Sequence, residues 1–338
     1  MTSRVVIMGL KDLFVMDTPV PTLRGRKVLI TGAASGIGRA TALAAAAEGA
    51  ELVLTDLRAE QLDAVVAEIL DTDGTVLFHL AGDVSDYDWV RQFARQVDAE
   101  VGVMDVVMNI AGVSAWGTVE NLEHRHWQKM VDVNLMGPIH IIESFVPQMV
   151  RRGAGGHLVN VSSAAGLLAL PWHAAYSASK FGIRGVSEVL RFDLRRHGIG
   201  VSLVCPGGVD TPLVNTVEIV GVDRDDPRVK AAIDDFHRVA VSPDKAAKAI
   251  LDGVRKNRFL VYTSFDIRFG YWWARKFALP YEVAMRFAND RFDRLARIVR
   301  ESPRRSSADT AGADASGAGG AGGVGGASTD TGIPSDPN

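Results

Sequence analysis

The sequence predicts an α/β fold, in which a doubly wound parallel sheet of about seven strands is covered by helices on both faces. Between residues 25 and 264, short apolar runs alternate with longer segments that have helical spacing, and no internal repeat is evident. The runs are nearly all apolar, which is typical of parallel strands buried on both faces. The predicted strands are residues 27–31, 51–55, 76–80, 105–109, 157–162, 201–205 and 259–262.

Helices are predicted between these strands. An alanine-rich helix follows Gly38, and helical spacing also covers residues 58–70, 87–100 and 174–197. Because strand and helix alternate up to residue 264, we expect one α/β domain over residues 25–264, preceded by an N-terminal extension over residues 1–24. Periodicity alone fits any parallel α/β domain, so the function must come from particular residues.

The composition excludes several classes of protein. The chain has 338 residues, of which 47% are apolar, and a formal net charge of −3. That balance is unlike a general nucleic-acid binder. The single cysteine, Cys205, can form no internal disulfide and no cysteine-ligated zinc site, and it fits a reducing compartment. The apolar stretches at residues 5–10 and 13–16 are too short to span a membrane, so a cytoplasmic location is expected.

A glycine-rich turn joins the first strand to the first helix. Gly32, Gly36 and Gly38 stand in the segment Thr-Gly-Ala-Ala-Ser-Gly-Ile-Gly. Gly32 permits a tight turn, Gly36 lets the backbone approach a ligand, and Gly38 allows close packing of helix on strand. The N-terminus of the helix would then face a pyrophosphate with free N–H groups and a positive dipole end. A plain connector is the alternative, and the place of the turn after the first strand favours a phosphate site.

Asp56 ends the second strand. A carboxylate there accepts hydrogen bonds from the adenosine ribose and repels a 2′-phosphate, which favours NAD over NADP. Ser35 adds no positive charge for such a phosphate, whereas Arg39 and Arg58 would add one if they folded inward. A solvated turn residue is the alternative for Asp56.

Tyr176 and Lys180 form a Tyr-x-x-x-Lys pair inside a predicted helix. The spacing of four residues puts both side chains on one helical face. A phenol with a reference pKa of about 10 is a poor base at neutral pH, and a nearby ammonium group would stabilise its phenolate. The pair alone also fits an exposed tyrosine and lysine, so its neighbours decide the interpretation.

Those neighbours lie where strands end. Ser163 stands thirteen residues before Tyr176 and just after the strand 157–162, and ligands of open α/β sheets bind at the carboxyl ends of strands. Ser162 is the alternative serine, and the spacing to Tyr176 favours Ser163. Asn134 falls in a helix that leads toward the same strand, and further turns follow the fourth and sixth strands.

In this combination and order the motifs resemble the short-chain dehydrogenase/reductase family, in its compact single-domain form, over roughly residues 24–264. The resemblance implies a Rossmann-type NAD(P)-binding dehydrogenase domain. One departure is that the family's Asn-Asn-Ala-Gly reads Asn-Ile-Ala-Gly at residues 109–112. The catalytic residues that the resemblance implies are Asn134, Ser163, Tyr176 and Lys180. The cofactor-binding residues that it implies are Gly32, Ser35, Gly36, Ile37, Gly38, Asp56, Asp83, Val84, Asn109, Ala111, Gly112, Tyr176, Lys180, Pro206, Gly207, Val209 and Thr211.

The activity implied is the interconversion of a secondary alcohol and a ketone, or of an alcohol and an aldehyde, with Tyr176 as general acid/base. Ser163 would hydrogen-bond the substrate oxygen, Lys180 would lower the pKa of Tyr176 and bind the nicotinamide ribose, and Asn134 would hold a relay water. The implied partners are a small-molecule substrate and further copies of the chain in a dimer or tetramer, with no nucleic acid.

Three alternatives stay open beside this activity. A non-catalytic NAD-binding scaffold would be expected to lack at least one catalytic residue. An epimerase or dehydratase would be expected to have a differently spaced glycine turn and a larger substrate domain. A protein whose chief role is docking on a membrane surface is the third.

No metal site is predicted. His124 and His126 do not share a helical face, no cysteine or carboxylate completes a ligand set, and both are interpreted as surface histidines. Residues 213–237 fall where the family has a variable lid, and the apolar half at residues 213–222 predicts a partly hydrophobic substrate. Three further side chains are placed in the packing or at the rim of the substrate mouth, namely Trp116, Trp172 and His173.

The C-terminal part of the chain divides into two regions. Residues 265–300 hold nine of the 24 aromatic residues, with eight Lys/Arg against four Asp/Glu, and the extension is assigned to residues 265–301. A first helix is predicted to end near Pro280, and a second to cover residues 281–300. The helices are interpreted as packing on the core or a partner subunit, as a hydrophobic cover over the active site, or as a shallow attachment to an anionic membrane. Residues 302–338 are predicted to be a disordered tail.

Overall fold

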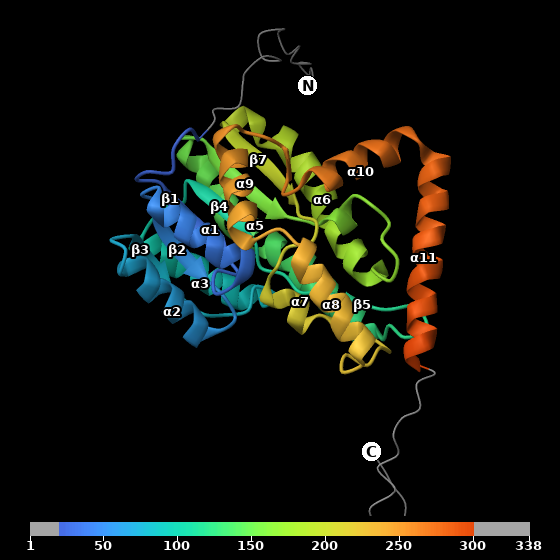
Figure 1. Ribbon diagram of the computed structural model, residues 1–338. Coiled ribbons are helices and arrows are strands. Elements are labelled where there is room, and N and C mark those ends of the chain that lie inside the picture. The colour runs from blue at the N-terminus through green and yellow to red at the C-terminus, as the bar shows by residue number, and fades with distance from the viewer. Residues whose placement is uncertain (1–19, 301–338) are drawn as a thin grey trace, which may run out of the picture. The chain divides into compact units, whose positions relative to one another are not determined.

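A seven-stranded parallel sheet forms the centre of the molecule, and its strand order is β3-β2-β1-β4-β6-β7-β9 (Figure 1). The computed structural model describes residues 20–300, so most of the N-terminal extension and the predicted tail lie outside the described residues. The strands are β1 (Lys27–Thr31), β2 (Glu51–Thr55), β3 (Thr75–His79), β4 (Val106–Asn109), β6 (Gly156–Val161), β7 (Ile199–Cys205) and β9 (Leu260–Tyr262). The predicted doubly wound α/β fold is confirmed. The strand order reverses direction between β1 and β4, which is where such sheets bind ligands.

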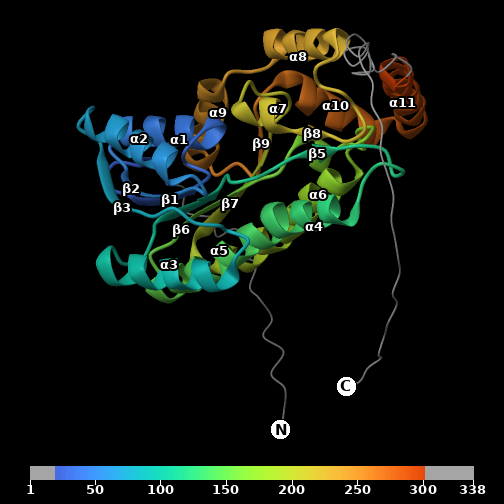
Figure 2. The same ribbon diagram turned by 90° about the horizontal axis from the view of Figure 1, so that it is seen from below.

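Helices cover both faces of the sheet, and Figure 2 shows the two layers edge-on. One layer consists of α1 (Gly36–Ala47), α2 (Ala59–Leu70) and α9 (Pro243–Arg255). The other consists of α3 (Tyr87–Glu100), α4 (His124–Val131), α5 (Gly137–Arg152) and α6 (Ala174–Asp193). Each layer buries its own apolar core against the strands, with Leu62 and Leu251 in the first and Phe93 and Phe145 in the second.

Between β7 and α9 the chain forms a small lid. It contains α7 (Pro212–Thr216), β8 (Glu218–Ile219) and α8 (Pro227–Val239). The strand β8 pairs in parallel with β5 (Ala115–Trp116), which follows β4. This two-stranded sheet was not predicted, because two residues are too few to carry a periodic pattern. It joins residues 212–239 to the segment that follows β4.

Two predicted elements differ from the structure. The strand β3 was expected to be buried on both faces, but its residues alternate between exposed and half-buried because it is an edge strand of the sheet. The helix predicted to end at residue 197 instead ends at Asp193 and is followed by a 3₁₀ turn at Arg195–His197. Gly198, with a left-handed φ of 66°, then leads into β7.

The C-terminal extension folds into α10 (Phe265–Lys276) and α11 (Ala278–Arg300). Two helices were predicted, but the break comes at Phe277 and not near Pro280. Pro280 occupies the first turn of α11, where its missing N–H costs no helical hydrogen bond. No helix between residues 20 and 300 is long and apolar enough to cross a bilayer.

Candidate active site

The side chains of Tyr176 and Lys180 lie one turn apart on α6, as their spacing predicts. The Lys180 ammonium is 5.6 Å from the centroid of the Tyr176 ring. The hydroxyl of Ser163, which follows β6, lies beside the phenol of Tyr176 and lowers the pKa of that phenol. The Ser163 hydroxyl also accepts a hydrogen bond of 3.1 Å from the backbone N–H of Ala165. Three residues from two elements therefore meet at the carboxyl end of a central strand.

The two neighbouring serines point to different partners. The hydroxyl of Ser162 is buried and donates to the carbonyl oxygen of Lys180 at 2.8 Å. A side chain at Gly166 would overlap this hydroxyl, since its Cβ would lie 2.2 Å from the Ser162 oxygen. The bond joins the end of β6 to α6 and leaves Ser163 as the serine that reaches Tyr176.

Burial sets the proton affinities of the pair. It raises the pKa of Tyr176 above its ordinary value, and the hydrogen bond with Ser163 opposes that rise. It also lowers the pKa of Lys180 to about 8, because removing an ammonium group from water disfavours its charged form. The ammonium donates to the carbonyl oxygen of Val161 at 3.0 Å. Lys180 is therefore charged at neutral pH and loses that charge as the pH rises through about 8.

Asn134 lies not in an ordinary helix but in a π-helical turn at Asp132–Met136, between α4 and α5. Such turns often occur at functional sites. The fully buried amide of Asn134 accepts from the N–H of Val113 and donates to its carbonyl oxygen, both at 2.9 Å. A Cβ at Gly112 would lie 3.0 Å from the Asn134 oxygen and 3.4 Å from the Lys180 nitrogen. The structure therefore brings Asn134, Gly112 and Lys180 together.

The glycine turn is packed so tightly that larger residues would not fit. Gly32 has a φ of +71°, and its Cβ would lie 2.7 Å from the Cα of Ala111. A Cβ at Gly38 would lie 1.9 Å from the carbonyl oxygen of Gly32. Gly36 has a φ of +52° and faces the methyl group of Thr211. The first turn of α1, which includes Ile37, holds no acidic residue, and its N-cap Ser35 makes no capping hydrogen bond. Such an uncapped helix start without an acidic side chain has the chemistry to bind an anion.

Asp56 is buried and is held by the chain around it. One carboxylate oxygen accepts from the N–H of Ala34 at 3.0 Å, and the other accepts from the N–H and Nε of Arg58 at 3.1 and 3.3 Å. Arg58 also donates to the hydroxyl of Ser35 at 2.7 Å. Arg39 points elsewhere and makes a two-pronged ion pair with Glu68 on α2. Of the two arginines, only Arg58 folds over the glycine turn.

The residues expected around the adenine lie next to Asp56. The backbone N–H of Gly82 donates to the carbonyl oxygen of Asp56 at 2.9 Å. The Asp83 carboxylate then accepts two hydrogen bonds from Ser85. Val84 is buried, and its carbonyl oxygen contacts the ring of His140 at 3.0 Å. The loop is therefore fixed from both sides.

Asn109 at the end of β4 turns into the sheet. Its amide donates to the side chain of Asn160 at 2.9 Å, and the Asn160 amide donates to Ser187 at 3.0 Å. The remaining oxygen of Asn109 is buried and has no partner among the described residues. The next residues are held by the hydroxyl of Thr31, which accepts from the N–H groups of Ile110 and Ala111.

The segment after β7 closes the site from the other side. The carbonyl oxygen of Pro206 accepts from the N–H of Ala164 at 2.7 Å, beside Ser163. Gly207 lies against Ile267 of α10, while Val209 forms a bridge with Val241. Together with the contact of Thr211 on Gly36, these contacts connect the two halves of the predicted cofactor site.

Two lid residues at the site were not predicted. The ring of Phe236 on α8 lies against Gly208, where a Cβ would be 2.9 Å away. The imidazole of His237 contacts the Asp210 carboxylate at 2.7 Å. Both contacts join residues far apart in the sequence, so local patterns do not predict them. The amphipathic spacing of α8 indicates only that one side of the helix packs on the domain.

The predicted substrate mouth carries two aromatic rings beside Tyr176. The rings of Trp116 and His173 are 4.6 Å apart, and those of His173 and Tyr176 are 6.2 Å apart. His173 also contacts the carbonyl oxygen of Pro171 at 2.6 Å. Burial lowers the pKa of His173, so its ring is neutral at physiological pH. Trp172, next to it, has a left-handed φ of 66°.

The expectation of a surface position is wrong for His126. Its side chain is only 2% exposed. One ring nitrogen accepts from the N–H of Glu123 at 2.9 Å, and the other contacts Glu218 of the lid at 3.0 Å. Glu218 also pairs with Arg125, and hydrogen bonds from Arg125 and His126 lower its pKa. His126 therefore holds the lid on α4.

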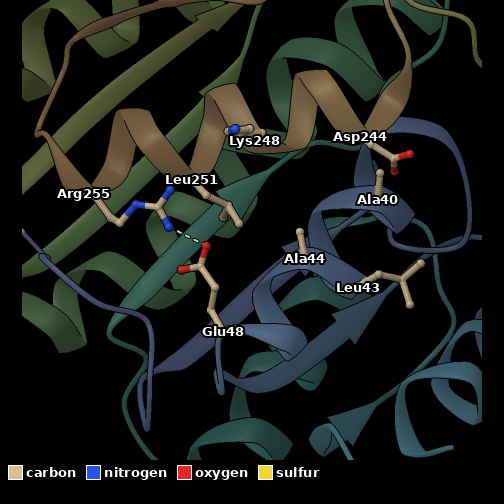
Figure 3. Close-up of a pocket in the computed structure, with 8 residues that line it drawn as sticks. All are labelled: Ala40, Leu43, Ala44, Glu48, Asp244, Lys248, Leu251 and Arg255. Atoms are coloured by element: carbon tan, nitrogen blue, oxygen red, sulfur yellow. Dashed lines mark hydrogen bonds and ion pairs between the residues drawn. The ribbon is translucent and has the colours of Figure 1, made fainter. Parts of the chain in front are cut away.

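Across residues 20–300, no three His, Cys, Asp or Glu side chains are grouped as a metal site would need. A groove of about 520 Å³ lies between α1 and α9 (Figure 3). Its rim carries the ion pair of Glu48 with Arg255. None of the predicted site residues lines it. The lining residues are Ala40, Leu43, Ala44, Glu48, Asp244, Lys248, Leu251 and Arg255.

The chain is similar in sequence to several known proteins. A family model described as short chain dehydrogenase matches residues 26–219. The probable oxidoreductase EphD of Mycobacterium tuberculosis H37Rv is 37% identical over 235 residues, which cover 68% of this chain and 40% of that protein. The chain thus spans about two fifths of the length of the first curated relatives that it matches. The putative oxidoreductase SadH of the same organism is 33% identical over 249 residues, or 73% of this chain and 89% of the relative.

Solved structures give the same picture. A short-chain dehydrogenase/reductase from Burkholderia phymatum in complex with NAD has a TM-score of 0.69 and 28% identity, and the match covers 75% of this chain and 94% of that one. A gluconate 5-dehydrogenase from Burkholderia cenocepacia, in complex with NADP and tartrate, has a TM-score of 0.64 and 25% identity, with 75% and 98% covered. Similar folds therefore hold either nicotinamide cofactor.

Proposed function

Because the chain belongs to the short-chain dehydrogenase family, we propose that it is an NAD(P)-dependent oxidoreductase that interconverts a secondary alcohol and a ketone, or an alcohol and an aldehyde. Tyr176 is the general acid/base, and the substrate is partly hydrophobic. One observation carries the proposal: Ser163, Tyr176 and Lys180 meet at the carboxyl end of β6. Asn134 completes the set from the π-helical turn.

The residues around the glycine turn fit a dinucleotide. The uncapped first turn of α1 and the absence of side chains at Gly32, Gly36 and Gly38 leave room and donors for a pyrophosphate. Asp56 and the loop with Asp83 and Val84 would hold the adenosine end. Residues 109–112 and 206–211, with Lys180, would hold the nicotinamide end.

Proton transfer belongs to Tyr176. The bound nicotinamide supplies the hydride acceptor or donor and, when oxidised, a further positive charge. In reduction, the neutral phenol that burial favours donates its proton to the carbonyl oxygen of the substrate. In oxidation, Tyr176 takes the hydroxyl proton as a phenolate, which the Lys180 ammonium stabilises. Ser163 donates to the substrate oxygen and stabilises negative charge that develops there.

Asn134 and Lys180 would pass the proton onward. The buried amide of Asn134 fixes the backbone at Val113. Its oxygen and the Lys180 nitrogen both lie beside Gly112, 3.0 and 3.4 Å from where a Cβ of that residue would be. With a pKa of about 8, Lys180 exchanges protons readily near neutral pH. We propose that a water held beside Asn134 links Lys180 to solvent.

NAD is the proposed cofactor. The buried Asp56 carboxylate presents negative charge beside the glycine turn and would repel a 2′-phosphate. Of Arg39 and Arg58, only Arg58 folds over the glycine turn, and its guanidinium is already bonded to Asp56 and Ser35. Its charge is therefore offset by the carboxylate that it contacts.

The rest of the site and its surroundings support the substrate and partner proposals. Trp116 and His173 give the mouth beside Tyr176 an aromatic and largely uncharged wall, which suits a partly hydrophobic alcohol. The outer side of α6 exposes Phe181, Val189 and Phe192, which are 42%, 60% and 70% exposed. Such a row on one helix suits an interface with a second copy in a homo-oligomer.

The proposal is tested by Tyr176→Phe, which removes the phenolic proton and keeps the ring. We expect kcat to fall by about 10²–10⁴-fold on a secondary alcohol that the wild type oxidises. The affinity for NADH, measured by its fluorescence, should stay within about threefold, since the change removes a single hydroxyl group. Tyr87→Phe, at a tyrosine 43% exposed on α3, is the matched control and should keep full activity.

Two outcomes contradict the proposal. Undiminished turnover by Tyr176→Phe would remove Tyr176 from the chemistry. Binding of NADH by the wild type without turnover on a panel of alcohols and ketones, with either cofactor, would favour the non-catalytic scaffold instead.

A further inference from the structure

Helix α10 presents a row of aromatic side chains to solvent. Phe265, Phe269 and Trp272 are 76%, 50% and 50% exposed, and Phe277, just past the helix, is 45% exposed. Successive ring centroids along these four residues are 6.1, 5.7 and 5.9 Å apart. The four residues are called the outer row below. Figure 1 shows α10 along the border of the described molecule, away from the sheet.

The opposite side of α10 is fixed to the dehydrogenase domain. Tyr271 is buried in a cluster with Leu167 and Leu203, and its hydroxyl accepts from Arg184 of α6 at 2.9 Å. Ile267 lies against Gly207. Because these contacts set the rotation of the helix about its axis, the outer row cannot turn inward without breaking them.

The charges around the outer row are mostly positive. Lys276 stands four residues after Trp272 and therefore on the same side of the helix. Arg268 and Arg275 lie along one flank, and both are exposed. Asp266, in the first turn, is the one acidic residue of α10. This face would therefore complement a surface that has a layer of negative charge and an apolar layer just beneath it.

The size of the row also limits what covers it. At the exposures above, four aromatic side chains offer on the order of 450 Å² of apolar surface. A stable protein interface needs about 800 Å² from each partner, so a second copy would need much more than this row. With twelve residues, α10 is about 18 Å long, which is too short to cross a bilayer but enough to lie along its surface.

We propose that α10 and Phe277 form a docking surface for a bilayer that contains anionic lipids. The helix lies in the plane of the interface, with the outer row among the upper acyl chains and Arg268, Arg275 and Lys276 at the phosphate groups. Because Ile267 lies against Gly207, the docked helix would connect the lipid surface to the segment after β7 that belongs to the candidate active site. A partly hydrophobic alcohol dissolved in the membrane would then be close to Tyr176. The docking itself does not depend on the proposed chemistry.

The test is co-sedimentation of the full chain with vesicles of phosphatidylcholine alone or with one third phosphatidylglycerol. We expect binding to the anionic vesicles that weakens as salt rises. The double variant Phe269→Ser/Trp272→Ser should lower the partition coefficient at least tenfold. Arg268→Glu/Lys276→Glu should remove the preference for anionic lipid. The matched control Val119→Ser/Val239→Ser replaces side chains that are 80% and 81% exposed elsewhere, and it should bind as the wild type does.

A second measurement reports insertion. Brominated acyl chains should quench part of the tryptophan fluorescence of the bound wild type, and Trp272→Phe should bind equally but lose most of that quenching. Thermal unfolding confirms that each variant is folded. The proposal is overturned if the wild type does not bind anionic vesicles, or if the Phe269/Trp272 variant binds as well as the control. Loss of a dimer by that variant in sedimentation velocity, without lipid binding by the wild type, would show that a second copy covers the row.

Discussion

Asp56 is the residue on which we propose that the choice between NAD and NADP depends. Its carboxylate is buried, yet it keeps three hydrogen-bond donors, from Ala34 and from the backbone and side chain of Arg58. A buried carboxylate is tolerated only with such partners. The same bonds place the negative charge beside the glycine turn, and they occupy Arg58, the cation that would otherwise attract a phosphate.

Asp56→Asn should shift the preference from NAD toward NADP. The change keeps an oxygen for the Ala34 N–H but removes the charge, and it leaves Arg58 free to contact a 2′-phosphate. Hydrogen bonds to charged groups contribute about 1.5–3 kcal/mol, so the ratio of kcat/KM for NAD over NADP should fall by about 10- to 100-fold. Adding Arg58→Ala should reverse the gain with NADP.

The control for this change is Asp63→Asn on α2, an exposed aspartate that pairs with His79. It should leave the ratio unchanged. An unaltered ratio in Asp56→Asn, or a wild type that already prefers NADP, would show that Asp56 does not select the cofactor.

The β1–turn–α1 unit is the element whose geometry is least tolerant of change. Its helix begins so close to the turn that the Gly38 backbone nearly touches that of Gly32. Thr31 ties the same turn to the residues after β4 through two hydrogen bonds of 3.1 Å. The element therefore positions the glycine turn and the loop at residues 110–112 together.

Gly38→Ala should damage this element. The new methyl group would lie 1.9 Å from a backbone oxygen, which cannot rotate away as a flexible side chain can. The helix must shift, so we expect a loss of about 1–3 kcal/mol of folding stability and NADH binding at least tenfold weaker.

Gly270→Ala on α10 is the matched control, because its Cβ would make an ordinary contact of 3.6 Å with Leu168. Removing a helical glycine there should stabilise the chain by up to about 1 kcal/mol. Chemical denaturation and NADH titration measure both effects. Equal NADH affinity in Gly38→Ala and the wild type would show that the close approach is not needed for binding.

At the scale of the whole molecule, the C-terminal extension is built into the wall of the site. The hydroxyl of Tyr271 on α10 accepts a hydrogen bond from Arg184 of α6, and the hydroxyl of Tyr281 on α11 accepts one from the N–H of Ala169 at 2.8 Å. Ala169 belongs to the loop between Ser163 and Tyr176. The inner side of α10 therefore packs on the core, which is one of the three interpretations of residues 265–300. The outer row of the same helix is exposed.

Truncation after Ser264 should therefore destabilise the domain. It uncovers the cluster around Leu167, Leu203 and Cys205 that Tyr271 fills, and loss of one buried aromatic side chain alone costs about 3–5 kcal/mol. The melting temperature should fall by several degrees. Truncation after residue 300, which removes the predicted tail, is the control and should leave the melting temperature and activity unchanged. A stable and fully active chain ending at Ser264 would show that α10 is not part of the fold.

Much of the fold could be predicted because it depends on local patterns. All seven strands of the main sheet were predicted to within two residues at every end, since buried parallel strands are continuous apolar runs bounded by turns. The pair β5–β8 was not predicted, and the break between the two C-terminal helices was predicted near Pro280 but lies at Phe277. Two-residue strands and helix ends depend on contacts with distant segments, which local spacing does not carry.

The sequence by itself determined the architecture and a short set of residues for chemistry, because glycine spacing, strand ends and the Tyr176–Lys180 interval are properties of adjacent residues. Only the tertiary structure decided which side chains act together. It turned Ser162 to a backbone carbonyl and Ser163 to Tyr176, and it folded Arg58 but not Arg39 over the glycine turn. It also fixed the outer row of α10 toward solvent. The physical reason is that the direction of a side chain is set by packing and hydrogen bonds with segments remote in the chain.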